Sequence, residues 1–81
     1  MMNTQLPVAV NNAHLLREWR KDQGISHEDV CGILHISIAT LYRIEAGITQ
    51  PRIDRCNDIV SMTHGKIRYR DLIPNFKPEY A

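Results

Sequence analysis

The chain has 81 residues, a formal net charge of +1 and an apolar content of 43%. This length suits one small domain with a modest core, which dimerisation would stabilise further. No apolar run approaches the roughly 18 residues of a membrane span, and the N-terminus lacks the basic and apolar pattern of a signal peptide, so we expect a cytoplasmic protein.

The first ten residues are predicted to lie outside the folded domain, as a flexible N-terminal arm. Pro7 opposes helix formation there. Val8 and Val10 alternate with Ala9, so a short strand is the alternative to a mobile arm. The folded domain is expected to span residues 11–74.

The first helix is predicted over residues 13–23. Asn12 has the side chain of an N-cap, and Gly24 is typical of a helix end. The apolar stripe of this helix, which we expect in the core, consists of Leu15, Leu16 and Trp19.

Two short helices joined by a tight turn are predicted next, over residues 27–34 and 38–46. Ser26 and Ser37 are placed as their N-caps, and Gly47 lies where a helix often ends in a left-handed residue. Apolar residues recur at helical spacing on both segments. They are Val30, Cys31, Leu34, Ile36, Leu41 and Ile44.

A fourth helix is predicted over 51–62, with Pro51 in its first turn. Its buried face is expected to contain Ile53, Cys56, Ile59 and Val60. A short fifth helix over 69–73 is stopped by Pro74. The predicted class is therefore all-α with five helices, and the alternative is α+β with a short strand near 66–69.

Metal binding and catalysis are not expected. Cys31 and Cys56 lie on apolar helix faces and are predicted to be buried, reduced thiols. The histidines have no metal-ligand spacing with one another or with the cysteines, so we expect neither a metal nor a cofactor. No nucleophile–base pair, carboxylate cluster or phosphate loop indicates an enzyme.

The distribution of charge is more informative than its total. Between residues 38 and 70 the basic side chains outnumber the acidic ones. They are Arg43, Arg52, Arg55, Lys66, Arg68 and Arg70. A basic face that binds a polyanion is compatible with this pattern, and an ordinary solvated surface is the alternative.

Two short motifs connect the chain with a known family. Residues 34–37 have the order aliphatic, histidine, aliphatic, serine, and residues 43–47 have the order Arg, aliphatic, Glu, x, Gly. On these motifs, residues 13–63 resemble the helix-turn-helix domain of Cro/C1-type repressors, with fainter similarity to phage and mobile-element regulators up to Pro74. The family usually has glycine at His35, where the turn needs a left-handed backbone, so the turn here is expected either to be slightly strained or to take another geometry.

The resemblance implies a small lambda-repressor-like domain whose recognition helix, 38–46, enters the major groove. The implied base contacts are Ile38, Ala39, Tyr42 and Arg43. The implied contacts to the DNA backbone are Ser26, His27, Ser37, Thr40, Thr49, Gln50, Arg52 and Arg55. An ion pair between Arg20 and Glu45 is implied as well. The alternative for Ile38 and Tyr42 is that the former completes the core and the latter covers its rim.

A C-terminal tail, 75–81, is expected to take part in a dimer contact. The apolar residues assigned to that contact are Leu72, Ile73, Phe76 and Tyr80. The alternative is that the tail folds back onto its own monomer.

The predicted function is sequence-specific DNA binding by a transcriptional regulator. The resemblance implies a homodimeric repressor on a palindromic operator, with double-stranded DNA as its partner and no small-molecule ligand. An antitoxin that represses its own operon is one alternative. A protein-interaction module that does not bind DNA is the other.

Overall fold

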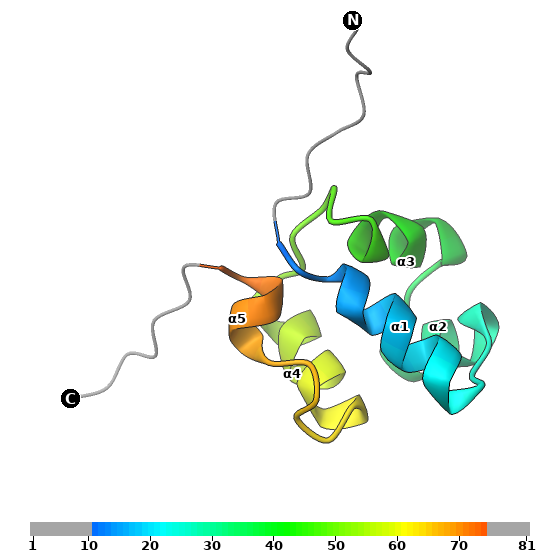
Figure 1. The fold of residues 1–81 in the computed structure, drawn as a ribbon. Coiled ribbons are helices and arrows are strands. Elements are labelled where there is room, and N and C mark those ends of the chain that lie inside the picture. Colours follow the sequence, from blue (N-terminus) through cyan, green and yellow to red (C-terminus); the bar gives the residue numbers. More distant parts are fainter. Residues whose placement is uncertain (1–10, 75–81) are drawn as a thin grey trace, which may run out of the picture.

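A computed structural model of the chain describes residues 11–74, which fold into five helices (Figure 1). They are α1 (His14–Gln23), α2 (His27–Leu34), α3 (Ile38–Glu45), α4 (Ile53–Met62) and α5 (Tyr69–Leu72). No strand occurs within residues 11–74, so the all-α prediction is confirmed and the alternative with a strand near 66–69 is wrong. The arm predicted over 1–10 and the tail predicted over 75–81 lie outside the described residues.

The turn between α4 and α5 explains why residues 66–69 do not form a strand. The buried Thr63 hydroxyl donates to the Ile59 carbonyl at 2.9 Å and accepts the N–H of Ile67 at 3.1 Å. The N–H of Lys66 donates to the Thr63 carbonyl at 3.1 Å. The end of α4 therefore uses the backbone donors that a strand would need, and the chain continues into α5.

The start of α1 differs from the prediction. Ala13 is the N-cap, and its N–H donates to Asn11 Oδ1 at 3.0 Å. Asn12 is exposed and is not the cap, so the prediction for it is wrong. The Asn11 side chain reaches the N–H of Ala13 because a second hydrogen bond, from its Nδ2 to the Leu72 carbonyl at 3.0 Å, holds it in place. The helix ends as predicted at Gly24, which has a φ of 67°.

The two central helices begin at the predicted serines. Ser26 Oγ accepts the N–H of Asp29 at 3.1 Å, and Ser37 Oγ accepts that of Thr40 at 3.1 Å. Between them His35 closes α2 with φ 57° and ψ 48°. Of the two alternatives for this turn, this is the left-handed conformation, which costs a residue other than glycine about 1–2 kcal/mol. The turn directs α3 across α2, so that the two helices pack together (Figure 1).

Helix α4 begins at Ile53, later than predicted. Arg52 is its N-cap, and the Arg52 carbonyl accepts the N–H of Cys56 at 2.9 Å. Pro51 lies outside the helix, and its carbonyl accepts from the Cys56 thiol at 3.6 Å instead. The predictions that Pro51 lies in the first turn and that Ile53 is buried are therefore wrong, since Ile53 is 46% exposed. Cys56 and Ile59 are buried as predicted.

All five helices contribute to one hydrophobic core. Helix α1 packs on α3, α2 packs on α3 and α4, and α4 packs on α5. The buried apolar side chains are Ala13, Leu16, Val30, Cys31, Leu34, Leu41, Ile44, Cys56, Ile59, Ile67 and Leu72. The predicted burial of both cysteines is confirmed. Leu72 is completely buried by its own chain, so it presents no surface to a second copy and the prediction that it contacts a dimer partner is wrong.

The segment before α1 is tied to α5. The N–H of Asn12 donates to the Asp71 carbonyl at 2.8 Å, beside the bond from Asn11 to Leu72. Asp71 Oδ2 accepts the N–H of Arg68 at 2.8 Å, which fixes the first turn of α5. We call Asn11, Asn12, Asp71 and Leu72 the terminal clasp. The clasp holds the two ends of the described domain side by side.

Candidate nucleic-acid interface

Helix α3 presents one side to the core and the other to solvent. Its buried side chains are Leu41, Ile44 and Glu45. Its exposed side chains, which we call the α3 ridge, are Ile38, Ala39, Tyr42 and Arg43. Ile38 is 40% exposed and Tyr42 is 54% exposed. The structure thus brings the four predicted base-contact residues together on one accessible surface, and neither Ile38 nor Tyr42 is enclosed in the core.

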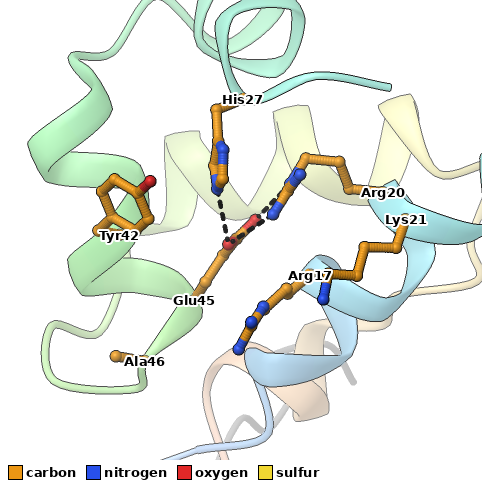
Figure 2. A pocket seen from close by; sticks show the side chains of 7 residues that line it. All are labelled: Arg17, Arg20, Lys21, His27, Tyr42, Glu45 and Ala46. Atoms are coloured by element: carbon orange, nitrogen blue, oxygen red, sulfur yellow. Dashed lines mark hydrogen bonds and ion pairs between the residues drawn. The ribbon is translucent and has the colours of Figure 1, made fainter. Parts of the chain in front are cut away.

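A buried ion pair behind the α3 ridge joins α1 to α3 (Figure 2). Arg20 donates from Nε to Glu45 Oε2 at 3.0 Å and from Nη2 to Oε1 at 3.3 Å. The two side chains are only 7% and 4% exposed. The pair implied by the family resemblance is therefore present, with both carboxylate oxygens of Glu45 engaged.

His27, the first residue of α2, lies next to two residues of α3. Its Nε2 is 3.7 Å from Glu45 Oε1. Its ring centroid is 4.7 Å from that of Tyr42, at an interplanar angle of 44°. Figure 2 shows His27 reaching from α2 toward Glu45, with Tyr42 beside it on α3. The start of α2 therefore packs directly against a side chain of the α3 ridge.

A pocket of about 330 Å³ opens between α3 and α1. We call it the α1 pocket, and its lining residues are Arg17, Arg20, Lys21, His27, Tyr42, Glu45 and Ala46. Figure 2 shows Arg17 and Lys21 on the α1 side of the pocket and Tyr42 and Ala46 on the α3 side. Arg17 and Lys21 are exposed, and neither forms an ion pair with any residue in 11–74.

A second pocket, of about 300 Å³, opens on the other flank of α3, toward the start of α4. We call it the α4 pocket, and its lining residues are Thr40, Ile44, Thr49, Gln50, Pro51, Arg52, Asp54 and Arg55. Arg55 Nη1 donates to the Leu34 carbonyl and lies 4.0 Å from the Asp58 carboxylate, so its guanidinium is used within the chain. Arg52 is exposed and has no ion-pair partner in the described part of the chain.

The α3 ridge lies between the two pockets. Tyr42 lines the α1 pocket, and Thr40 lines the α4 pocket. Since successive helical residues are about 100° apart, Thr40 and Tyr42 point to opposite flanks of α3, with Ala39 and Arg43 exposed between them. The α3 ridge is therefore flanked by two pockets, and each pocket is lined in part by cationic side chains.

A comparison with protein-family models gives a match over residues 13–64 to a model described as a helix-turn-helix domain. The chain belongs to the helix-turn-helix domain family. Helix-turn-helix domains bind DNA and are typically not enzymes, so the family indicates a DNA-binding protein. Comparisons with curated proteins and with solved structures give no match.

The predicted backbone-contact residues of this helix-turn-helix domain differ in what their side chains already do. The hydroxyls of Ser26 and Ser37 accept the capping hydrogen bonds of α2 and α3. Ser37 Oγ also donates to Thr40 Oγ1 at 2.9 Å. Thr49 and Gln50 are exposed in the loop that follows α3.

The remaining predicted dimer contacts are divided between the core and the undescribed tail. Ile73 is half-buried and packs against the core of the helix-turn-helix domain. Phe76 and Tyr80 lie outside the described residues. The large apolar side chains that the domain exposes are Ile33, Ile38, Tyr42, Ile48 and Ile53.

Sequence reasoning missed two residues of the α1 pocket, Arg17 and Lys21. The signal that was available is their spacing. Residues four positions apart share a helix face, and Arg17 and Lys21 both lie one turn or less from Arg20. Because Arg20 pairs with Glu45 of α3, its neighbours Arg17 and Lys21 could also have been placed on the side of α1 that faces α3.

The two free thiols are inert residues of the core. Burial raises the pKa of the Cys56 thiol, and burial together with the charges of Glu45 and Glu28 raises the pKa of Cys31. Within residues 11–74 no group of three or more His, Cys, Asp or Glu side chains is arranged to hold a metal ion. None of the described helices is long and apolar enough to cross a membrane.

Proposed function

We propose that the chain is a sequence-specific transcriptional regulator of the Cro/C1 type, acting as a homodimeric repressor on a palindromic operator. The observation that carries the proposal is the α3 ridge. Four side chains able to contact bases project from a short helix whose opposite side is fixed in the core. A rigid, projecting helix edge is the shape that the major groove of DNA accepts.

The chemistry of the α3 ridge suits base recognition. The Arg43 guanidinium is exposed and can donate to both O6 and N7 of a guanine. Ile38 and Ala39 are apolar and fit the methyl group of thymine. Tyr42 can donate its hydroxyl to a phosphate or pack against a sugar. We therefore assign to Arg43 the largest contribution to DNA sequence specificity.

The residues beside the α3 ridge suit contacts to the DNA backbone. The N-terminus of α2 offers backbone N–H groups at the positive end of its helix dipole, with His27 next to them. Thr49, Gln50 and Arg52 are exposed on the opposite flank. Phosphate contacts of this kind release counterions, so we expect operator affinity to fall steeply as the salt concentration rises.

Repression needs no chemistry beyond occupancy of the operator. A twofold dimer would place its two recognition helices in successive major grooves, about 10 bp apart. A dimer bound there excludes polymerase from an overlapping promoter. The proposed action is therefore competition for a DNA site.

The proposal is tested by selecting ligands from random-sequence duplex DNA. We expect enrichment of a palindrome whose half-sites lie about 10 bp apart, and a solution mass of two chains on the selected duplex. Absence of any enriched sequence would favour a protein-interaction module instead. A stable complex with the product of a neighbouring gene, measured as a mass increase, would favour an antitoxin.

A pair of variants separates base recognition from backbone contact. Arg43→Ala should cost about 1–3 kcal/mol of operator binding and relax the choice of one base pair. Arg52→Ala should weaken binding to all duplexes equally and reduce the salt dependence. Both side chains are exposed, so folding should be unaffected. Competition binding with single-substituted operators measures both effects, and identical behaviour of the two variants would make Arg43 a backbone contact.

A further inference from the structure

The α1 pocket contains more positive charge than the fold uses. Its one carboxylate, Glu45, is buried and bonded through both oxygens to Arg20. Arg17 and Lys21 have no acidic partner among residues 11–74. Because Arg20 and Glu45 neutralise each other, Arg17 and Lys21 determine the charge that the pocket presents to a ligand.

Arg17 and Lys21 lie next to each other on one face of α1, an arrangement that an anion would stabilise. They are four positions apart on α1, and like charges at that spacing destabilise a helix by a few tenths of a kcal/mol. An anion held between them removes this repulsion and gains two charge-assisted hydrogen bonds. Figure 2 shows both side chains on the α1 side of the pocket, facing Tyr42 and Ala46 of α3 across the opening.

The position of the α1 pocket selects the kind of anion. Tyr42 belongs both to the α3 ridge and to the wall of the pocket. A helix lying in the major groove has a phosphate backbone along each flank. The α4 pocket lies on one flank and the α1 pocket on the other. A duplex bound to the α3 ridge therefore brings one of its backbones to the opening of the α1 pocket.

We propose that Arg17 and Lys21 bind a DNA phosphate at the α1 pocket, which makes α1 a third DNA-contacting helix beside α2 and α3. This inference rests on the proposed DNA-binding function. The Arg17 guanidinium presents a planar fork to two phosphate oxygens, and the Lys21 ammonium adds a point charge. The contact fixes the position of the duplex along α3 and selects no base.

The test compares the unmodified protein with variants in which a cationic side chain is replaced by an uncharged one. Arg17→Gln and Lys21→Gln are measured singly and together, on the selected operator and on a random-sequence duplex, between 0.05 and about 0.3 M salt. Lys66→Gln is the matched control, since Lys66 is an exposed cation in the turn between α4 and α5, away from α3 (Figure 1).

Each single variant should weaken binding to both duplexes by about sixty-fold at 0.1 M salt, because a homodimer loses one phosphate contact in each subunit and its salt slope changes by about 1.8. The slope should fall by about 2 for each variant, one unit for each subunit of the dimer, and stay unchanged for Lys66→Gln. Because the two cations share one phosphate, the double variant should lose less than the two single losses combined. Arg17→Lys and Lys21→Arg, which keep the charge, should keep the slope.

Chemical substitution of the DNA locates the contact. Operators in which two symmetry-related phosphates, one in each half-site, are replaced together by neutral methylphosphonates should include one such position where the unmodified protein and Arg17→Gln bind equally well. At all other positions the difference between the two proteins should persist. A long-range electrostatic effect would instead give no such position, and it would overturn the inference.

Failure of the inference differs from failure of the proposed function. If the unmodified protein binds its operator with a steep salt dependence while the Arg17 and Lys21 variants behave like Lys66→Gln, the phosphate contact is absent and DNA binding stands. If the unmodified protein binds no duplex, both proposals fall together. Circular dichroism and thermal melting of each variant show whether the exposed substitutions leave the fold intact.

Discussion

Gly32 lies in the middle of α2, where a glycine has no evident use. A Cβ built there would meet no heavy atom within 4 Å, and the residue is exposed. Glycine inside a helix is less favourable than alanine by about 1 kcal/mol. We therefore predict that Gly32→Ala raises the free energy of unfolding by about 0.5–1 kcal/mol, measured by urea denaturation.

The matched control for this prediction is Gly24→Ala, the same chemical change in a different backbone conformation. Gly24 also has open space around it, but its φ is 67°. Alanine in this left-handed region costs about 1–2 kcal/mol, so Gly24→Ala should lower the stability. A gain in stability at both positions would show that the backbone conformation at Gly24 is not the deciding factor.

Single-residue features were predictable where the signal and its partner are close in sequence. Ser26 and Ser37 each cap a backbone N–H only three positions away. The left-handed backbone of His35 was one of the two geometries that the turn allowed. Asn11 could not be predicted, because the carbonyl that fixes its side chain belongs to Leu72, which is 61 positions away. The sequence offered two adjacent asparagines and no local reason to prefer the first.

At the scale of the helices, the ion pair between Arg20 and Glu45 holds α1 against α3. Glu45→Gln leaves the Arg20 charge buried without its counter-charge, so we predict a loss of about 3–5 kcal/mol in the free energy of unfolding. This loss is large for a domain of this size, and the variant should melt far below the unmodified protein in calorimetry.

The double variant Arg20→Met, Glu45→Leu provides the control for the ion-pair prediction. Apolar residues of similar volume often replace a buried pair with little loss or with a gain. We expect the double variant to recover most of the stability lost by Glu45→Gln. A double variant as unstable as the single one would mean that the packing of these side chains, and not their charge, holds α1 and α3 together.

The terminal clasp gives a second prediction at the scale of the helices. Asn11→Ala removes an acceptor for the N–H of Ala13 and a donor to the Leu72 carbonyl, in a side chain that is 7% exposed. Leaving buried polar groups without partners costs about 1–3 kcal/mol. Thermal and urea denaturation should show this loss.

Asn12→Ala is the matched control for the clasp. Asn12 contributes only its backbone N–H to the clasp, and its side chain is exposed. Its replacement should change the stability by no more than about 0.5 kcal/mol. Equal losses for Asn11→Ala and Asn12→Ala would contradict the role given to the two hydrogen bonds of the Asn11 side chain.

Two predicted boundaries were wrong where a side chain bonds to the backbone a few positions away. Proline is common in the first turn of a helix, which placed Pro51 inside α4. In the structure the Pro51 carbonyl bonds with the Cys56 thiol, and the helix starts only after it. Residues 66–69 alternate like a strand, but Thr63 ties their backbone to α4. Both bonds are local, but the residue types that form them also fit the helix start and the strand that were predicted.

At the scale of the whole molecule, the periodicity of residues 38–46 was enough to predict the α3 ridge. The side that faces solvent follows from helical geometry once Leu41 and Ile44 are assigned to the core. The α1 pocket was not predictable in the same way. It requires α1, α2 and α3 to meet at one place, which only the packing of the complete domain determines.

The buried thiols give a prediction for the whole domain under alkaline conditions. Burial raises the pKa of Cys31 and Cys56, so the folded chain keeps both thiol protons at a pH where the unfolded chain loses them. The stability linked to these thiols is fully present below their ordinary pKa of about 8.5, and it is lost as the pH rises toward the raised pKa. Urea denaturation between pH 7.5 and about 9.5, with reductant present, should show the decline.

The double variant Cys31→Ala, Cys56→Ala isolates this effect. It should be less stable than the unmodified protein at pH 7.5, because two buried side chains become smaller. Its stability should nevertheless change less between pH 7.5 and about 9.5. An equally steep alkaline decline in the double variant would assign the effect to other groups.

The terminal clasp also has a consequence for engineering. Because Asn12 bonds directly to Asp71, a short linker could join residue 74 to residue 11 without stretching the chain. New ends could then be opened at the exposed turn of residues 64–66, far from α3. Such a circular permutant would keep the α3 ridge and both pockets intact, and it would move any fused reporter to the side of the protein away from α3 (Figure 1).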